Sequence, residues 1–240
     1  MFPITLNVEL KNHILKKAMM SYGILSGLEI AEAVERQNQY ARVQRYLTEE
    51  PSTVVRLHKR QLAVSMEDLP RIHISNFSAT ASSAGGALNP NSYNLKLHPE
   101  LLVYTGQELD SRKDNPTQKL VIPDSGLLLT PGELYLARTV EYTETYNLVP
   151  VIDGRSSTGR LGLAAHVTAG YGDNGFKGTW TLELFVVRPL RIYPDTAIAQ
   201  IRYHTLAPGA DTYKGKYNNT VDEPAIASRL FRENPIKSEL

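Results

Sequence analysis

From residue 91 onward, hydrophobic and polar residues alternate in short segments that are separated by turn residues. The segments with the clearest alternating or apolar pattern are residues 93–97, 127–129, 134–140, 148–152, 163–169, 179–187 and 197–203. Glycine and proline turns such as Pro131-Gly132 and Pro208-Gly209 lie between or after them. Strands that recur every ~8–12 residues between such turns are typical of an all-β barrel or sandwich. The pattern therefore predicts a mainly β protein with few helices.

The segment 179–187 carries a single carboxylate in an otherwise largely apolar strand. Because side chains alternate between the two faces of a strand, Trp180 and Leu182 share one face and Glu183 lies on the other, with Thr181. A charge in such a strand needs either a partner or a function. Its position alone leaves two alternatives open, a pocket or a structural ion pair at a contact between subunits.

The N-terminal part of the chain has a helix signal. Ser26 and Glu29 have the spacing of a capping box, in which each side chain bonds the backbone N–H of the other residue. A helix is predicted to start here, to run through residues 35–47 and to end before Pro51. Residues 53–69 fit a strand or a helix equally well, and the Ser/Ala/Gly-rich residues 75–86 are predicted to form a loop.

The loop that follows residues 148–152 has the composition of an anion-binding site. In Gly154–Ser157, the glycine permits the turn, the arginine can bind an anion bidentately, and the serine hydroxyls and N–H groups can surround it. Alone this signal is weak, because serine-rich turns commonly cap their own backbone. Arg160 lies one helical turn further on, next to the apolar Leu161, and we expect it to be half-buried.

Two other residues have an ordinary structural interpretation when taken alone. Asp173 lies in a glycine turn, where aspartate is a common turn residue. His166 lies in the apolar segment 163–169 and is expected to be a core histidine. None of the six histidines has a metal-binding spacing such as His-Glu-x-x-His.

Composition and charge exclude several classes of protein. The 240 residues are 42% hydrophobic and 21% charged, which is enough for one folded domain with an ordinary core. A net charge of +1 gives no electrostatic case for nucleic acid or an anionic membrane. The absence of cysteine excludes disulfides and cysteine-bound zinc. The first residues do not have the pattern of a signal peptide, and no apolar run reaches about 18 residues, so we expect a cytoplasmic protein without a membrane span.

Several motifs together resemble the dCTP deaminase family, within the dUTPase-like superfamily. The ordered set that carries the resemblance comprises Gly154-Arg155-Ser156-Ser157 with Arg160-Leu161-Gly162, His166-x-Thr168-Ala169, Gly172-Asp173-x-Gly175-Phe176-x-Gly178 and Thr181-Leu182-Glu183. Further matching pieces are Ile24-Leu25-Ser26, Asn89-Pro90-Asn91-Ser92-Tyr93-Asn94-Leu95, Leu129-x-Pro131-Gly132-Glu133, Val140-Glu141-Tyr142, Tyr213-Lys214-Gly215-Lys216-Tyr217 and Ala227-Ser228-Arg229. The resemblance covers roughly residues 24–34 and 72–230.

The resemblance divides the chain into three parts. Residues 1–23 are an N-terminal extension, residues 24–230 are the dCTP deaminase-like domain with an insertion at about 35–70, and residues 231–240 are a tail. It implies a distorted dUTPase-like β-barrel (β-clip fold) that forms a homotrimer, with each active site between subunits. It also implies hydrolytic deamination of dCTP to dUTP and ammonia, which feeds dUMP and dTTP synthesis, with dTTP as a feedback inhibitor.

The resemblance also assigns roles to residues. Glu183 is the general base and acid, and Ser156 and Arg160 hold the water and the developing charge. Asp173 binds the sugar 3′-hydroxyl, and the Thr181 backbone reads the base edge. The remaining substrate-binding positions are Arg155, Ser157, Thr158, Gly159, Thr168, Leu182, Tyr213, Lys216 and Thr220. Mg²⁺ is expected to arrive with the triphosphate, no residue is assigned as a metal ligand, and zinc is not expected, because zinc deaminases need a Pro-Cys-x-x-Cys motif.

Three departures from the family pattern keep alternatives open. Thr220 stands where a phosphate-binding Gln is usual, and Asn174 replaces a common Pro. Gly159 occurs where purely deaminating members often carry Ala and bifunctional members often carry Gly. The glycine leaves open a bifunctional enzyme that releases dUMP and pyrophosphate, and the insertion at about 35–70 leaves open a non-catalytic nucleotide-binding trimer. A pure dUTPase fits less well, because such enzymes end in a Gly-rich arm and lack the pair Arg160 and Glu183.

Overall fold

The computed structural model describes residues 23–49, 67, 69–166, 168–207, 209–219 and 225–233. This part of the chain is mainly β with few helices, as predicted. Its elements in order are α2 (Gly27–Glu49), β1 (Arg71–Ile74), η1 (Ser82–Ala84), β2 (Tyr93–Tyr104), β3 (Thr117–Val121), β4 (Leu127–Leu129), β5 (Tyr135–Tyr146), β6 (Leu148–Gly154), α4 (Ser156–Gly159), β7 (Leu163–Ala165), β8 (Lys177–Val186), β9 (Leu190–Ile192), β10 (Ala197–Thr205) and η2 (Leu230–Arg232).

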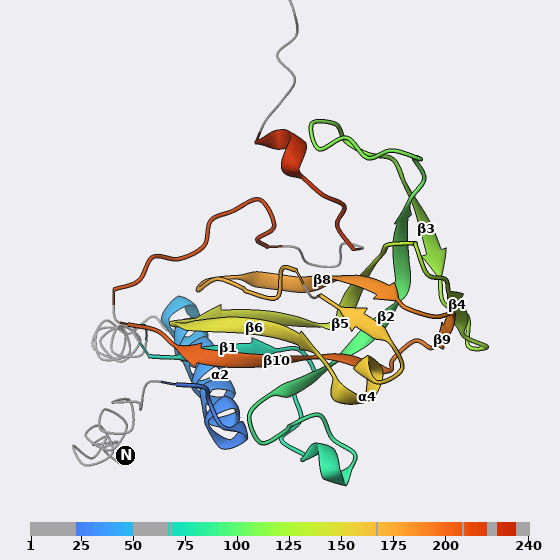
Figure 1. Cartoon of the computed structure of the whole chain (residues 1–240). Helices are drawn as coiled ribbons and strands as arrows, with labels where there is room; N and C mark the ends of the chain where they lie inside the picture. Colours follow the sequence, from blue (N-terminus) through green and yellow to red (C-terminus); the bar gives the residue numbers. More distant parts are fainter. Residues whose placement is uncertain are drawn as a thin grey trace, which may run out of the picture.

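The main sheet is antiparallel and curls towards a barrel (Figure 1). Its strand order is β6-β10-β2-β5-β8-β7, with β1 added beside β5 and β3 beside β2. The two ends of this order meet through the loop after β7. The Ile152 N–H donates to the Gly170 carbonyl (2.7 Å), and the Gly172 N–H donates to the Pro150 carbonyl (2.9 Å). These bonds bring the loop that leads to β8 against β6 and nearly close the barrel.

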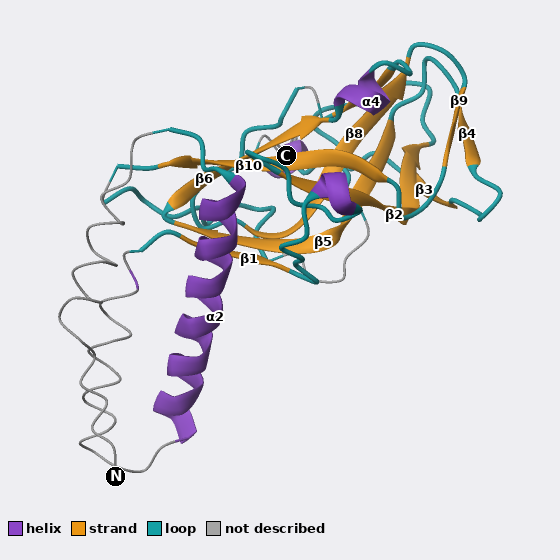
Figure 2. Ribbon diagram, turned by 90° about the horizontal axis from the view of Figure 1, so that it is seen from below, coloured by secondary structure: helices purple, strands orange, loops and turns teal. Residues whose placement is uncertain are grey.

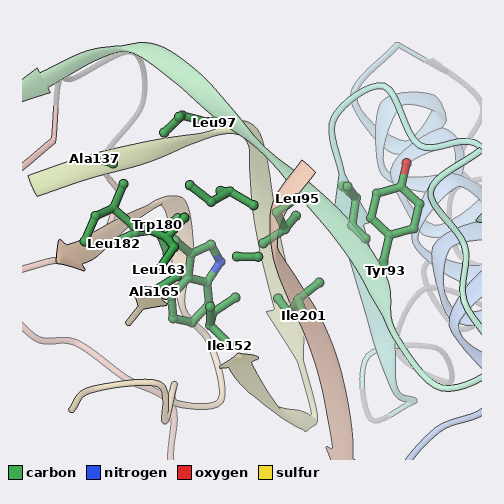
Figure 3. Close-up of a cluster of buried hydrophobic side chains, with 14 of the residues drawn as sticks. Tyr93, Leu95, Leu97, Ala137, Ile152, Leu163, Ala165, Trp180, Leu182 and Ile201 are labelled. Atoms are coloured by element: carbon green, nitrogen blue, oxygen red, sulfur yellow. The ribbon is translucent and has the colours of Figure 1, made fainter. Parts of the chain in front are cut away.

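The core fills the inside of this barrel with side chains from several strands (Figure 3). On β8, Trp180, Leu182, Leu184 and Val186 are buried, whereas Thr181 and Glu183 on the other face are half-buried and Phe185 is exposed. The predicted alternation of this strand is therefore confirmed. The indole N–H of Trp180 donates to Thr143 Oγ1 (2.9 Å), so the one polar atom of this large side chain is satisfied inside the core.

Helix α2 begins at the predicted capping box. The Ser26 N–H donates to Glu29 Oε2 (2.8 Å), and the Glu29 N–H lies 3.3 Å from Ser26 Oγ. Among the helix residues whose side chains are described, the buried apolar ones lie in the first turns, namely Ile30, Ala33 and Val34. The rest of the helix runs away from the sheet (Figure 2), so the start of the predicted insertion continues the helix beyond the barrel.

Two expectations about strands need correction or qualification. Residues 163–169 were expected as one apolar segment, but the strand ends at Ala165, and His166 has a positive φ of 57°. Gly132 makes the expected turn, with φ 89°, but the strands around it do not form a hairpin. Strand β4 pairs with β9 instead, in a separate two-stranded sheet. A local pattern predicts a strand, but it does not say which distant segment completes it.

Some sequence-based expectations lie outside the described residues. They concern the extension up to residue 22, the part of the insertion at 50–66 and 68, the tail from residue 234, and Thr220. The proposed boundaries between extension, domain and tail stay predictions. None of the helices in the described ranges is long and apolar enough to cross a membrane.

Candidate active site

Glu183 lies on the outer face of β8 with His166 beside it. Both residues are placed by the pairing of β7 with β8, and the His166 N–H donates to the Glu183 carbonyl (2.9 Å). His166 Nδ1 is 2.8 Å from Glu183 Oε2, with the imidazole side chain 6% exposed and the carboxylate side chain 27% exposed. Neither imidazole nitrogen, nor this carboxylate oxygen, has an aligned hydrogen bond among the described residues. Buried polar atoms without such a bond call for an explanation, and a bound ligand supplies one.

A positive charge lies two residues along the neighbouring strand on the same outer face. Arg138 of β5 pairs directly with Thr181, and Leu136 pairs with Glu183. The Arg138 guanidinium lies 2.7 Å from His98 Nε2. Burial and the charge of Arg138 lower the pKa of His98, which favours a neutral ring that accepts the bond. Sequence reasoning missed both Arg138 and the contact of His166 with Glu183, because neither follows from a local pattern.

The anion-binding loop is held by a chain of amide and hydroxyl contacts. Ser92 Oγ donates to Gln200 Oε1 (2.9 Å), and Gln200 Nε2 donates to the Gly154 carbonyl (3.1 Å). Asn89 Nδ2 contacts both Ser92 Oγ (3.1 Å) and Asn94 Oδ1 (2.9 Å). The segment before β2 and strand β10 therefore fix the start of the loop. The polar run Asn89–Asn94 before an apolar strand was the available signal in the sequence.

Helix α4 presents the predicted serine and arginine residues to the outside of the barrel. Ser156, Ser157, Gly159 and Arg160 are exposed, whereas Thr158 is half-buried and donates to the Arg155 carbonyl (2.9 Å). Arg155 is half-buried and donates to the Ala197 carbonyl (2.8 Å). The expectation of a half-buried Arg160 is wrong for the single chain. The apolar neighbour that suggested burial, Leu161, is itself 62% exposed.

The other predicted substrate-binding residues of this part of the chain lie around β8 and its preceding turn. Asp173 and Thr168 are exposed, and Asp173 opens a turn in which Gly175 has φ 86°. Thr181 Oγ1 accepts a bond from the Ile226 N–H (3.0 Å), so the C-terminal segment lies over this face of β8. Leu182 is fully buried in the core, which leaves only its backbone for a substrate contact.

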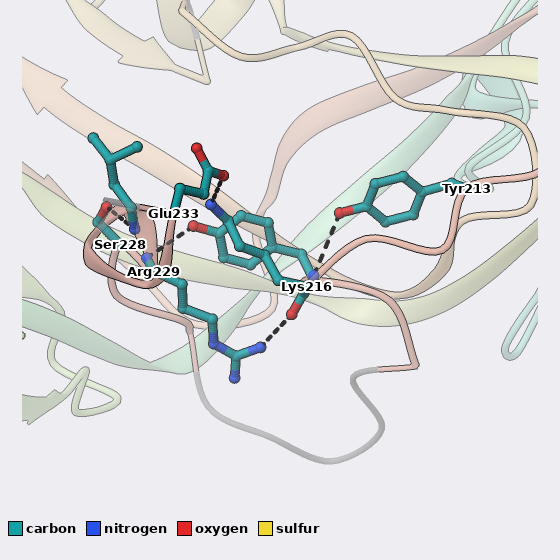
Figure 4. Close-up of polar contacts among 7 residues, drawn as sticks. Tyr213, Lys216, Ser228, Arg229 and Glu233 are labelled. Atoms are coloured by element: carbon teal, nitrogen blue, oxygen red, sulfur yellow. Dashed lines mark hydrogen bonds and ion pairs between the residues drawn. The ribbon is translucent and has the colours of Figure 1, made fainter. Parts of the chain in front are cut away.

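The C-terminal segment contacts its own chain at the residues predicted to bind phosphate (Figure 4). The Tyr213 ring lies near Phe176, with ring centroids 6.4 Å apart, and the Tyr213 hydroxyl accepts a bond from the Tyr217 N–H (3.4 Å). Lys216 forms an ion pair with Glu233, and Arg229 donates to the Lys216 carbonyl. The lysine is therefore held by an acidic residue of the segment in which it lies.

The structure thus assembles two separate groups of predicted residues. Glu183, Thr181, Asp173 and Tyr213 lie on or beside β8 and its preceding turn, whereas the serines and Arg160 lie on α4. No hydrogen bond or ion pair within the described ranges joins Arg160 or Ser156 to Glu183. The exposed apolar residues Leu161, Phe185 and Val187 lie near the ends of β7 and β8, and the Val187 N–H donates to the Gly162 carbonyl (3.0 Å).

Comparison with known proteins gives a consistent family. The sequence model of a family described as dCTP deaminase-like matches residues 56–206, which is more than half of the 240 residues. A relative from Clostridium acetobutylicum, named "dCTP deaminase, dUMP-forming", is 59% identical over 146 residues, covering 60% of this chain and 84% of the relative. Relatives of the same name from Hathewaya histolytica (56% over 146 residues; 60% and 85% covered) and Cytophaga hutchinsonii (56% over 148 residues; 61% and 86% covered) are similar.

A solved structure of a related enzyme also aligns with the chain. It is the 2′-deoxycytidine 5′-triphosphate deaminase from Agrobacterium tumefaciens, at a TM-score of 0.48 and 15% identity, and the alignment covers 78% of this chain and 49% of that chain. The mainly β, barrel-like fold is assigned from the antiparallel sheet described above, and the family is assigned from the match to the sequence model.

Proposed function

The chain belongs to the dCTP deaminase-like family, and on that premise we propose that it deaminates dCTP and releases dUMP. The observation that carries the product is the shared name of relatives that are 56–59% identical to this chain, "dCTP deaminase, dUMP-forming". This favours the bifunctional alternative over a pure deaminase whose final product is dUTP.

In the proposed deamination, Glu183 takes a proton from water as the water oxygen adds to C4 of cytosine. The carboxyl group passes this proton to N3, then takes the proton of the new C4 hydroxyl and passes it to the amino group, which leaves as ammonia as the C4–N4 bond breaks and the C4 carbonyl forms. The half-buried position of Glu183 and its 2.8 Å contact with His166 Nδ1 support this role, because a neighbouring imidazole can orient the carboxylate. Ser156 and Arg160 are proposed to hold the water and the developing negative charge.

In the proposed second step, a further water adds to the α-phosphorus of dUTP. The bond from that phosphorus to the bridging oxygen breaks, and dUMP and pyrophosphate leave. Gly159 bears on this step through the resemblance alone, because bifunctional members of the family often carry glycine there. A Cβ atom at this position would meet nothing within 4 Å in the described chain, so the chain's own fold does not require the glycine.

We propose that a homotrimer completes the site, with α4 of one copy facing Glu183 of another. The exposure of Arg160, together with the exposed Leu161 and Val187 near it, supports such a contact. Arg155 and Ser157 would bind phosphate, and Thr158, Gly159 and Thr168 would line the same substrate site. Asp173 would bind the sugar, and Tyr213, Lys216 and Thr220 would close over the triphosphate. Feedback by dTTP also stays a prediction.

Mg²⁺ is proposed to enter with the triphosphate. Among the described residues, no group of three or more His, Cys, Asp or Glu could hold a metal ion. The proposed reaction has no step that depends on a metal ion held by the protein. Zinc independence is likewise a prediction, and it is tested by measuring turnover after exhaustive zinc chelation with Mg²⁺ supplied in excess.

The test of the proposed function is a product analysis. Purified protein is incubated with dCTP and Mg²⁺, and chromatography resolves dCTP, dUTP and dUMP while ammonia and pyrophosphate are measured separately. Equal amounts of ammonia, dUMP and pyrophosphate support the proposal. Ammonia with accumulating dUTP and no pyrophosphate would identify a pure deaminase. Nucleotide binding without either product would identify a non-catalytic trimer.

A further inference from the structure

Asn174 makes polar contacts in several directions from a buried position. This residue is 5% exposed and follows Asp173 in the turn before β8. Its Oδ1 accepts a bond from the Asn147 N–H (2.7 Å), and its Nδ2 donates to the Asp211 carbonyl (3.2 Å). Its own carbonyl accepts a bond from the Tyr213 N–H (2.7 Å). One side chain thus joins the Asp173 turn to the end of β5 and to the C-terminal segment.

Asn147 extends this connection to the end of the insertion. It adopts φ 57°, and its Nδ2 donates to the Glu67 carbonyl (2.9 Å) and contacts the Leu69 carbonyl (3.3 Å). Arg71 extends these polar contacts to helix α2. The Arg71 guanidinium donates to Gln37 Oε1 (2.9 Å) and lies 3.9 Å from the Tyr40 ring centroid. The insertion is therefore tied to the turn that carries Asp173.

We propose that Asn174 is a positioning residue for the nucleotide, which holds Asp173 and Tyr213 in register with the end of the insertion. This inference rests on the proposed function, because Asp173 and Tyr213 are assigned to the nucleotide there. An asparagine suits the position because it offers both an acceptor and a donor on one short side chain. The proline that is common here in the family supplies neither.

The expected consequence is a change in substrate binding. Without the Asn174 side chain, the bonds to the Asn147 N–H and to the Asp211 carbonyl are lost, and the backbone bond from the Tyr213 N–H to the Asn174 carbonyl loses this support. Glu183 and His166 keep their places beside β7 and β8. Residues that act through ground-state contacts appear mainly in KM, whereas loss of transition-state contacts lowers kcat. We therefore expect Asn174→Ala to raise KM for dCTP about fivefold to tenfold, the range for one or two hydrogen bonds, with kcat changed less than about twofold.

Two further variants each remove one part of this set of hydrogen bonds. Asn174→Asp keeps the acceptor for the Asn147 N–H but loses the donor to the Asp211 carbonyl. Asn147→Gly keeps the positive φ and the N–H bond to Asn174 but loses the bonds to Glu67 and Leu69. A matched control is Asn115→Ala in the loop between β2 and β3. Its side chain also makes several local bonds, to the N–H and carbonyl of Asp110 and to the Lys113 carbonyl.

The experiment measures KM and kcat for dCTP, and amide hydrogen exchange at Asn147 and Tyr213 in the full-length, nucleotide-free protein. Asn174→Ala should speed exchange at both amides and raise KM. Asn174→Asp should leave the Asn147 amide protected, speed exchange at Tyr213 and still raise KM. Asn147→Gly should raise KM with the Tyr213 amide still protected, and Asn115→Ala should change neither quantity.

Several results would overturn the inference. An unchanged KM for dCTP in both Asn174→Ala and Asn174→Asp would overturn it, even if amide hydrogen exchange is faster, because the residue would then have a structural role only. A fall of kcat as large as the rise of KM would also overturn it. Failure of the proposed function is distinct: the wild-type chain would then release no ammonia from dCTP. In that case the KM for dCTP is replaced by the Kd for dCTP and dUTP, and an unchanged Kd in both Asn174 variants overturns the inference. If Asn174→Ala does not fold, the Asn174→Asp result decides.

Discussion

The two groups of candidate site residues differ in how far the single chain fixes them. Glu183 belongs to a strand whose inner face is anchored in the core, and His166 lies against its carboxylate. Helix α4, which carries Ser156 and Arg160, is a single exposed turn on the outside of the barrel. The fold of one chain thus sets the geometry of Glu183, which is proposed to transfer protons. Ser156 and Arg160, which are proposed to hold the water and the developing charge, lie exposed on the surface of that chain.

The two groups differ because packing in the core holds one of them and water surrounds the other. A carboxylate on a packed strand is positioned by core packing, so its geometry survives changes at the surface. An exposed arginine gains little from its own chain, because water solvates the guanidinium and several rotamers are open to it. A second copy that covers α4 would both desolvate Arg160 and fix its rotamer. Four predictions test this contrast.

The largest effect is expected from Glu183→Gln. Glutamine keeps the shape of the side chain on β8 but cannot accept and return a proton, so deamination should fall by roughly 10²–10⁴. Ammonia release from dCTP measures the loss, and thermal unfolding and nucleotide binding should stay close to wild type. Turnover within a few-fold of wild type would remove Glu183 from the mechanism.

Arg160→Ala should lower kcat by roughly 10²–10³, the usual cost of removing one group that stabilises developing charge. Because the Arg160 side chain is exposed and makes no hydrogen bond or ion pair with a described residue, the melting temperature should not change. The KM for dCTP should rise less than kcat falls. Arg155→Ala is the matched comparison, in which KM should rise more than kcat falls.

Mixing the two inactive variants tests whether Glu183 and Arg160 come from different copies. Glu183→Gln and Arg160→Ala chains are unfolded, mixed in equal amounts and refolded together. If each site takes one residue from each of two copies, about one quarter of the sites regain both native residues, and about one quarter of wild-type activity returns. Activity that stays at the level of the separate variants would place both residues on the same chain.

A smaller loss is expected from His166→Asn. Asparagine tolerates the positive φ of this position but does not fill the space of the imidazole beside Glu183. A carboxylate that is no longer held should lower kcat by about 10–10². Thermal unfolding measures any accompanying loss of packing. An unchanged kcat with a lowered melting temperature would reduce His166 to a packing role.

The smallest effect concerns Glu141, a carboxylate that the fold encloses on the inner face of β5. It is 7% exposed and accepts a bond from the Lys96 N–H (2.8 Å), and burial raises its pKa. A raised pKa in the folded state means that stability is fully present below the unfolded pKa and is lost as pH rises through the folded pKa. Glu141→Gln should therefore gain melting temperature relative to wild type between pH 4 and pH 8.

The control for this prediction is Glu100→Gln. The hydrogen bond from Lys119 lowers the pKa of Glu100, so its contribution to stability is lost as pH falls and has the opposite sign. The effect should be smaller than at Glu141, because Glu100 lies at the surface. A difference between wild type and Glu141→Gln that does not change with pH would contradict the predicted titration.

How well each feature could be predicted from the sequence depends on how far apart in the chain its interacting residues lie. The capping box at Ser26 and the alternation around Trp180 are set by neighbours within a few residues, and both predictions are confirmed. The pairing of β4 with β9 joins residues more than sixty positions apart, and nothing local indicates it. The error at Arg160 has another cause, because an apolar neighbour signals burial only when the chain has something to bury it against.

Strand β10 has a consequence for the synthesis of the chain. It lies between β6 and β2 in the sheet, and the Leu25 N–H at the start of the domain bonds to its Tyr203 carbonyl (2.9 Å). Its two neighbours, β2 and β6, must therefore wait, each with one edge unpaired, until residues 197–205 have left the ribosome. Such non-local pairing slows folding and leaves strand edges open to wrong partners in the meantime. The barrel forms only after nearly the whole chain has been made.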